Sequence, residues 1–418
     1  MSLPRFIQIH TLHAYPAALL NRDDAGLAKR LPLGNAVRTR ISSQCLKRHW
    51  RVTEDQFSLE KLDVPMASRS RIFFEEIRKK LVETNVPIDI ADVCANTLRD
   101  AFRKNLDKLI KEAKKAKDEK KKKGETQELD EDEAGTENSG EQKQAILLGL
   151  PEYEYLKQIC IRVAKTAISG AEVRLTLLEQ LKAERSNFDQ MPLNCGLESA
   201  LFGRMVTSDV FASREASISV AHAFTVHQAQ VENDYFTVVD DLKHEGSAGI
   251  FDTELASGLY YGYVVVDVPQ LVENLEGIAA TDCFAGGTLS ERRELAGRVV
   301  QHLLHLIATV SPGAKRGSTA PFDWAKFMLV EAGDWQPRSL AGAFHDALPL
   351  EEKNSKNSMR QRAVARISQE LSAMDEAYGA PLSRRFLSLD AVEVPGAERI
   401  NLAKLGEWAS EIVRQGVC

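Results

Sequence analysis

Basic and hydroxyl side chains are concentrated in residues 38–51, which read Arg-Thr-Arg-Ile-Ser-Ser-Gln-Cys-Leu-Lys-Arg-His-Trp-Arg. Leu46 and Trp50 are four residues apart, which is the spacing along one face of a short helix. A serine at its start, Ser42 or Ser43, would cap this helix by accepting hydrogen bonds from its first N–H groups. These N–H groups point outward, so a helix start surrounded by cations can bind an anion such as a nucleic-acid phosphate.

The segment that precedes this helix is also basic, because it contains Arg22, Lys29, Arg30, Arg38 and Arg40. The whole chain is not basic: it has 54 Lys and Arg residues and 60 Asp and Glu residues, and its formal net charge is -6. The net charge excludes a uniformly basic nucleic-acid-binding protein, so such binding would depend on this local segment. A solvated basic face on an ordinary surface helix is the alternative interpretation.

The composition is that of a globular protein with a substantial core. The chain has 418 residues, of which 44% are hydrophobic and 27% are charged, enough for two or three domains. Its six cysteines are scattered without a C-x-x-C spacing, which argues against a zinc site or a disulfide framework and is typical of a reducing cytosol. The N-terminus lacks an apolar signal region and no window has the length of a membrane span. We therefore expect a cytoplasmic protein that binds no membrane.

Acidic and histidine pairs could also do chemistry, but each has a structural alternative. Asp23 and Asp24 could bind a metal ion or act as acid and base. We favour a turn closed by its own side chain. His10 and His13 have a spacing that metal ligands can use, but no acidic or sulfur ligand is nearby in the sequence. We favour structural histidines.

Hydrophobic periodicity predicts a mixed fold. Alternation of apolar and polar residues, or runs rich in β-forming residues, predict strands at residues 6–11, 201–208, 217–226, 232–241, 259–268 and 322–330. Residues 55–195 have helical periodicity, and residues 290–310 form the clearest single helix. This order predicts an α+β fold, a ferredoxin-like or RNA-recognition-type sheet with a helical domain inserted after the first helix.

Three features of this fold could be exposed. Residues 229–255 are polar and too long for a tight turn, which predicts a projecting loop or hairpin arm. Residues 112–143 combine a lysine run with an acidic run, and such blocks rarely pack, so we expect a flexible or partly helical excursion. The polar face of the first strand, which carries Gln8 and His10, is expected to be open for contacts.

Six separated blocks of sequence form a specific set, although no single block is unique. The blocks are 6–10, 21–24 (Asn-Arg-Asp-Asp), 40–48 (Arg-Ile-Ser-Ser-Gln, then Leu-Lys-Arg), 203–205 (Gly-Arg-Met), 236–241 (Phe-Thr, then Asp-Asp) and 312–315 (Pro-Gly-Ala-Lys). In this order the chain closely resembles the backbone subunit of type I-E CRISPR surveillance complexes, the CasC subunit of Cascade. The resemblance covers most of residues 5–330.

The resemblance implies a modified RNA-recognition fold shaped like a hand. The expected parts are the palm at 1–60 and 196–340, helical fingers at 61–195, a thumb hairpin at about 229–255, and a C-terminal helical part at 341–418 that completes the palm. Members of this family line up head to tail along a guide RNA. Each thumb passes through the guide and flips out a nucleotide at every sixth position.

The resemblance also implies which residues touch RNA. The palm contacts would be Arg22, Lys29, Ser42, Gln44, Lys47 and Arg51, the wedge at the kink would be Met205, and the thumb contacts would be Tyr235, Phe236 and Thr237. Arg40, Arg48 and Lys315 complete the set of candidate RNA-binding residues. The chain has Tyr235 where the family has Trp, and Cys45 where the family often has Ser.

The function implied is a non-catalytic subunit that binds crRNA and presents its bases for pairing with target DNA in antiviral defence. Its partners would be crRNA, the target DNA strand, further copies of itself, the large, small, guide-end-capping and guide-processing subunits, and indirectly a helicase-nuclease or another effector nuclease. No cofactor or metal is expected. The rival hypothesis is a metal-dependent ribonuclease that uses Asp23, Asp24 or Asp234. A sequence-specific single-strand binder is a third.

Overall fold

The computed structural model divides the chain into two compact units. Residues 2–122, 145–166, 169–190, 193, 195–205, 210, 213–239, 247–286, 289–352, 356–379 and 382–418 are described. The sheet unit contains Met1–Leu62, Ser217–Glu273 and Ile278–Cys418, and the helical unit contains Asp63–Ala216 and Asn274–Gly277. Most of the charged excursion predicted at 112–143 lies outside the described residues.

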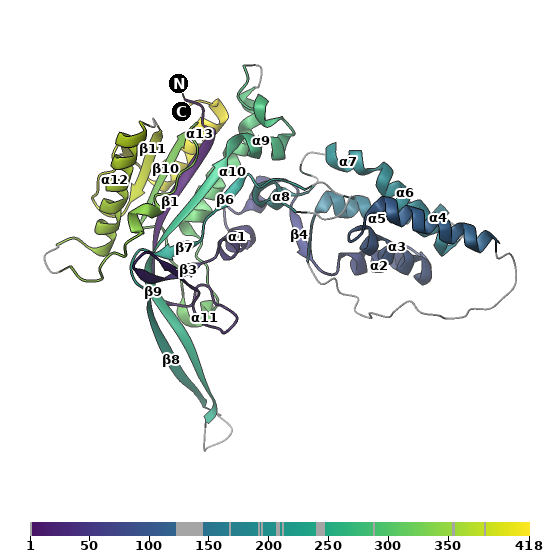
Figure 1. The fold of residues 1–418 in the computed structure, drawn as a ribbon, viewed down its shortest axis with the longest axis horizontal. Helices are drawn as coiled ribbons and strands as arrows, with labels where there is room; N and C mark the ends of the chain where they lie inside the picture. The colour runs from purple at the N-terminus through teal and green to yellow at the C-terminus, as the bar shows by residue number, and fades with distance from the viewer. Residues whose placement is uncertain are drawn as a thin grey trace. The chain divides into compact units, whose positions relative to one another are not determined.

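The sheet unit is built on a large and mainly antiparallel sheet (Figure 1). Its central path is β12-β11-β10-β1-β9-β7-β3-β2, and β6 and β8 pair with β9 off this path. The strands are β1 (Phe6–Ala18), β2 (Arg30–Leu33), β3 (Ala36–Ile41), β6 (Ile218–Val220), β7 (Ala223–Thr225), β8 (Gln230–Val239), β9 (Ser247–Asp267), β10 (Phe327–Gly333), β11 (Ser383–Ser388) and β12 (Ala397–Arg399). The pairing of β11 with β12 is parallel.

Helices cover both faces of this sheet. The helices are α1 (Ser43–Val52), η1 (Leu59–Leu62), α9 (Val268–Glu276), η2 (Ala280–Asp282), η3 (Ser290–Arg293), α10 (Glu294–Thr309), α11 (Arg316–Thr319), η4 (Ala341–Phe344), α12 (Met359–Tyr378) and α13 (Leu402–Gln415). On one face η4 and α12 enclose an apolar cluster with Leu12, Tyr261 and Phe327. The helix predicted at 290–310 is confirmed as η3 and α10, and most apolar residues of α10 are buried. Among the described residues, no helix is both long and apolar enough to cross a membrane.

The polar face of β1 is not open, so that expectation was wrong. Gln8 and His10 are buried, because the loop after β10 and the helix α12 cover this face. Here His10 Nε2 lies 3.1 Å from Glu331 Oε2, and Arg338 donates to both carboxylate oxygens of Glu331 at 2.6 and 2.9 Å. Burial raises the pKa of Glu331, but the hydrogen bonds from His10 and Arg338 outweigh it and hold the pKa well below its usual range.

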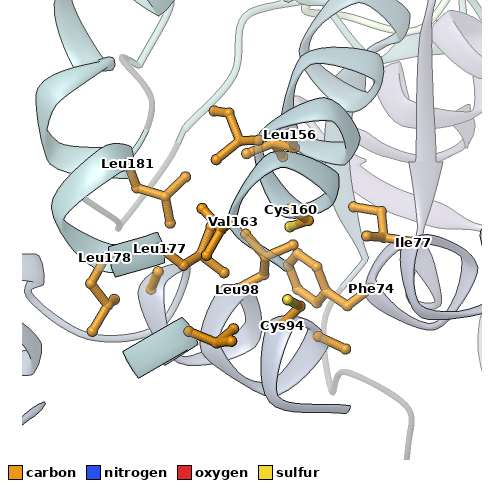
Figure 2. Packing of buried hydrophobic residues seen from close by; sticks show 14 of the residues in the cluster. Phe74, Ile77, Cys94, Leu98, Leu156, Cys160, Val163, Leu177, Leu178 and Leu181 are labelled. Atoms are coloured by element: carbon orange, nitrogen blue, oxygen red, sulfur yellow. The ribbon is translucent and has the colours of Figure 1, made fainter. Parts of the chain in front are cut away.

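The helical unit contains a core of its own. Its elements are β4 (Ala67–Ser70), α2 (Phe73–Glu83), α3 (Ile88–Ala101), α4 (Leu106–Lys122), β5 (Ile146–Gly149), α5 (Leu150–Thr166), α6 (Gly170–Ala183), α7 (Arg185–Gln190) and α8 (Leu197–Phe202). Apolar residues at helical spacing, including Phe74, Ile77 and Leu98, fill the core between α2, α3, α5 and α6 (Figure 2). The helical periodicity predicted for this region is therefore confirmed.

Residues 196–216 pack with the helical unit, although they were expected in the palm. Leu197 N–H donates to Pro65 O at 2.8 Å, which attaches α8 to the segment before β4. The prediction of a strand at 201–208 was wrong for its first two residues, because Leu201 and Phe202 are the last residues of α8. Leu197, Ala200 and Leu201 are buried at helical spacing, and that pattern outweighs the alternation read from the sequence. The part at 341–418 contains β11 and β12 as well as helices.

The buried His13 predicts acid sensitivity. Burial lowers the pKa of His13 to about 4, although Asp323 Oδ2 lies 3.8 Å from its Nδ1 and opposes the shift. The folded protein thus keeps His13 neutral at a pH where the unfolded chain takes up a proton. The free energy of unfolding should fall as the pH drops from 6.5 to 4, by up to about 3 kcal/mol from this residue.

Urea denaturation across this pH range tests the prediction, with His13→Gln as the comparison. The variant should lose this part of the pH dependence. An identical slope in both proteins would show that His13 is not the group responsible.

Candidate nucleic-acid interface

The start of α1 is capped by a serine and bonded to a neighbouring loop. Ser42 is the residue that caps α1, because its side chain accepts from Cys45 N–H at 3.3 Å. The first turn contains no acidic residue that would repel an anion. Asn21 Oδ1 accepts from Ser42 N–H at 2.9 Å, so the loop that contains Arg22 is fixed to the helix start. Trp50, on the opposite side of α1, is buried in the sheet unit.

Cations surround this helix start. Arg22 and Arg48 are exposed, and Lys29 is half-buried. Arg40 is held in place, because its Nη1 bonds His222 Nδ1 at 3.0 Å and its Nε donates to Arg30 O. We use "basic surface" for the candidate contacts of this segment. They are Arg22, Lys29, Arg40, Ser42, Gln44, Lys47, Arg48 and Arg51.

Two pKa shifts report the surroundings of α1. Burial raises the pKa of the Cys45 thiol, while Lys29 and Arg316 act on it in the opposite direction. Burial also lowers the pKa of Lys47, which is half-buried on α1. Arg316, in α11, therefore lies near α1 although 271 residues separate it from Cys45 in the sequence. The sequence alone did not indicate this position.

Arg38 does not belong to the basic surface, although the sequence counted it among the cations. Its side chain is fully buried. It donates to Thr225 O at 2.9 Å and to Phe344 O at 3.0 Å, so it joins β3 to two distant segments. Its charge satisfies buried carbonyl groups and is not available to a ligand.

The acidic pair at 23–24 lies in a turn. Leu27 N–H donates to Asp23 Oδ1 at 2.9 Å, and Asp23 N–H donates to Leu27 O at 2.8 Å. These bonds are those of the self-closed turn that the sequence favoured over a metal site. Within the part of the chain that the structure describes, no three His, Cys, Asp or Glu side chains are grouped so that they could hold a metal ion.

β8 and β9 form a long hairpin arm, as predicted for residues 229–255 (Figure 1). Because neighbouring residues of a strand point to opposite faces, the three candidate thumb residues are divided between two faces. Phe236 pairs with Phe251 on one face, whereas Tyr235 and Thr237 lie on the other face with Ile250. Tyr235 is 67% exposed and Ile250 59%. The arm therefore presents apolar side chains on both faces.

Contacts on both faces hold the middle of this arm. On one face Lys315 Nζ donates to Thr253 Oγ1 and lies 5.5 Å from the centroid of the Phe236 ring, a cation–π contact. On the other face Glu254 accepts from Ala28 N–H at 2.8 Å and forms an ion pair with Arg30. Glu254 thus compensates the charge of Arg30. It also joins the arm to the loop before β2, which contains part of the basic surface.

Met205 belongs to the helical unit. Its side chain is 93% exposed. The two residues before Met205 fix its position. Gly203 has a φ of 77°, which glycine adopts readily, and Arg204 is buried. Arg204 Nη1 donates to Glu152 Oε2 at 2.6 Å, so a buried ion pair anchors the residue before Met205.

An apolar groove of about 1050 Å³ lies elsewhere on the sheet unit. Phe322, Trp324 and Leu389 line it and are exposed. The residues that alternate with these two aromatic residues, Asp323 and Ala325, are buried. The backbone therefore presents Phe322 and Trp324 on the same side. Lys326, Arg399 and Lys404 also line the groove. The sequence did not single out this surface.

Residues 7–411 match the family model of the CT1975-like protein. The chain belongs to this family. No curated protein sequence matches it. Two solved chains, from structures titled "CRISPR RNA-guided surveillance complex, pre-nicking" and "CRISPR RNA-guided surveillance complex", have the same fold. The first is 23% identical with a TM-score of 0.70, and the comparison covers 97% of this chain and 100% of that one. The second is 20% identical with a TM-score of 0.61, and the coverage is 97% and 99%.

Glu254 acts as a clamp, because it binds both Ala28 N–H and Arg30. This clamp predicts how rigidly the CT1975-like protein holds its arm. Glu254→Ala removes the acceptor of Ala28 N–H and the partner of Arg30, which should cost about 1–3 kcal/mol of unfolding free energy. Hydrogen exchange of β8 should become faster. Glu232→Ala, an exposed acidic residue on the same arm, is the matched control. Equal effects of the two substitutions would contradict a clamp at Glu254.

Proposed function

We propose that this chain is a non-catalytic, guide-RNA-binding backbone subunit of a type I-E CRISPR surveillance complex, equivalent to CasC of Cascade. Family membership and the fold shared with chains of RNA-guided surveillance complexes support this proposal. The observation that carries it is the capped start of α1, surrounded by cations and joined to an arm with exposed aromatic residues.

Phosphate binding by the basic surface would be independent of base sequence. Arg and Lys side chains and helix N–H groups contact the backbone of a nucleic acid, which every guide has in common. This suits a subunit that must accept any guide. Specificity then depends on Watson–Crick pairing between the guide and its target DNA, as in another CRISPR effector.

The arm would separate and stack bases. Tyr235 and Phe236 offer rings on opposite faces, and an aromatic ring accepts any base because every base has a π-face. Met205 is the exposed apolar side chain that we assign to the wedge between stacked bases. Splayed bases would keep their pairing edges free for the target strand.

Self-association along the guide is the third part of the proposal. The arm carries the exposed side chains of Ile250 and Phe251, and Phe322 and Trp324 line a separate apolar groove. Different surfaces on one chain allow head-to-tail contacts, which form an open helix unless other subunits cap its ends. The expected partners are crRNA, target DNA, further copies and the other Cascade subunits, in the cytoplasm.

Phosphate contacts predict a change in salt dependence. Lys47→Ala and Arg48→Ala should each weaken binding to guide RNA and lower the slope of log affinity against log salt by about 0.7. Filter binding or fluorescence anisotropy over a range of KCl concentrations measures both quantities. Lys356→Ala, an exposed lysine before α12, is the control and should change neither. An unchanged slope in both basic-surface variants would remove α1 from the RNA interface.

Base stacking on Tyr235 predicts that alanine at this position weakens RNA binding and that phenylalanine does not. Tyr235→Ala should weaken RNA binding about 5- to 150-fold, which corresponds to the loss of one stacked base. Tyr235→Phe should bind almost as tightly as the wild type. Val231→Ala, near the base of the arm on the same face, is the control. Equal affinity of Tyr235→Ala and the wild type would contradict stacking at this position.

A metal-dependent ribonuclease remains the rival function, with Asp23, Asp24 or Asp234 as candidate metal ligands. The proposal predicts that guide and target stay intact when the loaded protein is incubated with Mg²⁺ or Mn²⁺. Cleavage at regular intervals that Asp23→Asn, Asp24→Asn or Asp234→Asn abolishes would replace the proposal with the enzyme. Preference for particular RNA sequences would instead favour a sequence-specific binder.

A further inference from the structure

His222 is an exposed side chain beside the basic surface, and the candidate RNA contacts do not include it. It lies in the short segment between β6 and β7. The last pair that joins β3 to β7 is Ile41 with Ala223. The next residue beyond this pair is Ser42 on one side and His222 on the other. His222 therefore follows the strand pair at the same end as the residue that caps α1.

Two cations act on the His222 ring. Arg40 Nη1, from β3, lies 3.0 Å from His222 Nδ1. Arg40 N–H also donates to Lys29 O at 2.8 Å, so the loop before β2 adjoins the same strand. Partial burial lowers the pKa of His222, and the charges of Arg40 and Lys29 lower it further. The ring is therefore neutral near pH 7.

The bond with Arg40 fixes which ring nitrogen of His222 carries the proton. A guanidinium group has no acceptor, so Nδ1 must accept and the proton of the neutral ring must lie on Nε2. Among the described residues, none forms a hydrogen bond with Nε2. An exposed N–H donor beside two cations suits an anion with several oxygen atoms, such as a phosphate.

We propose that His222 is a phosphate-binding residue of the basic surface, in which Nδ1 holds the guanidinium of Arg40 and Nε2–H donates to a phosphate oxygen of RNA. This inference rests on the proposed function, because it requires that the basic surface binds RNA. A role in folding alone would not need an exposed ring whose hydrogen bond leads to a cation of the candidate interface. Since every nucleotide has a phosphate, the contact adds affinity without base preference.

Substitutions at position 222 test both hydrogen bonds. The probe is a fluorescent uridine oligomer, because uracil does not titrate in the range in which histidine does. His222→Ala removes both bonds and should weaken binding about 10-fold near neutral pH. His222→Gln keeps an acceptor for Arg40 and an N–H donor for phosphate, so it should bind almost as tightly as the wild type. His345→Ala, at an exposed histidine outside the basic surface, is the control and should bind like the wild type.

The pH dependence of binding separates a phosphate contact from a role in folding. A bound phosphate favours the charged form of the ring, so RNA should raise the pKa of His222. Binding then takes up a proton, and wild-type affinity should rise as the pH falls through the range in which His222 titrates. His222→Gln should lack this part of the rise. Thermal unfolding without RNA checks that each variant retains the fold.

The outcomes distinguish this inference from the proposed function. A wild-type protein that binds no RNA would overturn both. If the wild type binds RNA and His222→Ala binds equally well, only the inference on His222 fails. An equal loss in His222→Ala and His222→Gln would also overturn it. If His222→Ala is unstable, the comparison of His222→Gln with the wild type decides, and identical pH profiles would count against the phosphate contact.

Discussion

Backbone pairing along β9 fixes the position of nearly every other part of the sheet unit. This strand has 21 residues, and it pairs with β1, β6, β7 and β8. One end lies in the buried sheet, and the other end is half of the hairpin arm. A two-stranded ribbon is marginal on its own, so the arm depends on its continuity with the sheet and on the contacts that Lys315 and Glu254 make near its middle.

The buried charges determine which surfaces are left for a ligand. His10, Glu331 and Arg338 fill the polar face of β1 with a closed hydrogen-bond network. The broad sheet face, which RNA-recognition domains use for bases, is therefore covered by protein in this chain. Contacts with RNA would instead use the start of α1, the loop before β2 and the edges of the arm. Each of these joins β9 directly or through Glu254.

Local patterns predicted much of this structure. The hairpin arm, η3 with α10, the helical insertion and the Ser42 cap all follow from periodicity or spacing within one segment. The family resemblance added an expected order of the parts. The family model that matches residues 7–411 shows membership of the CT1975-like family.

Contacts between distant segments could not be predicted. Arg38 looks like its exposed neighbours in the sequence, and only the carbonyl groups of Thr225 and Phe344 make it structural. Arg316 becomes part of the surroundings of α1 because α10, which precedes it in the chain, packs against α1. Gln8 and His10 alternate like an exposed face, since the sequence alone does not reveal that residues after 335 cover them. Likewise, the assignment of 196–216 to the helical unit depends on tertiary contacts such as Leu197 with Pro65.

The most direct test of the central claim is native mass spectrometry of the purified chain bound to guide RNAs of increasing length. A backbone subunit should add one copy for each fixed increment of RNA, whatever the base sequence. One copy on every RNA, or a stoichiometry that depends on sequence and not on length, would contradict a backbone role and favour an isolated RNA-binding domain.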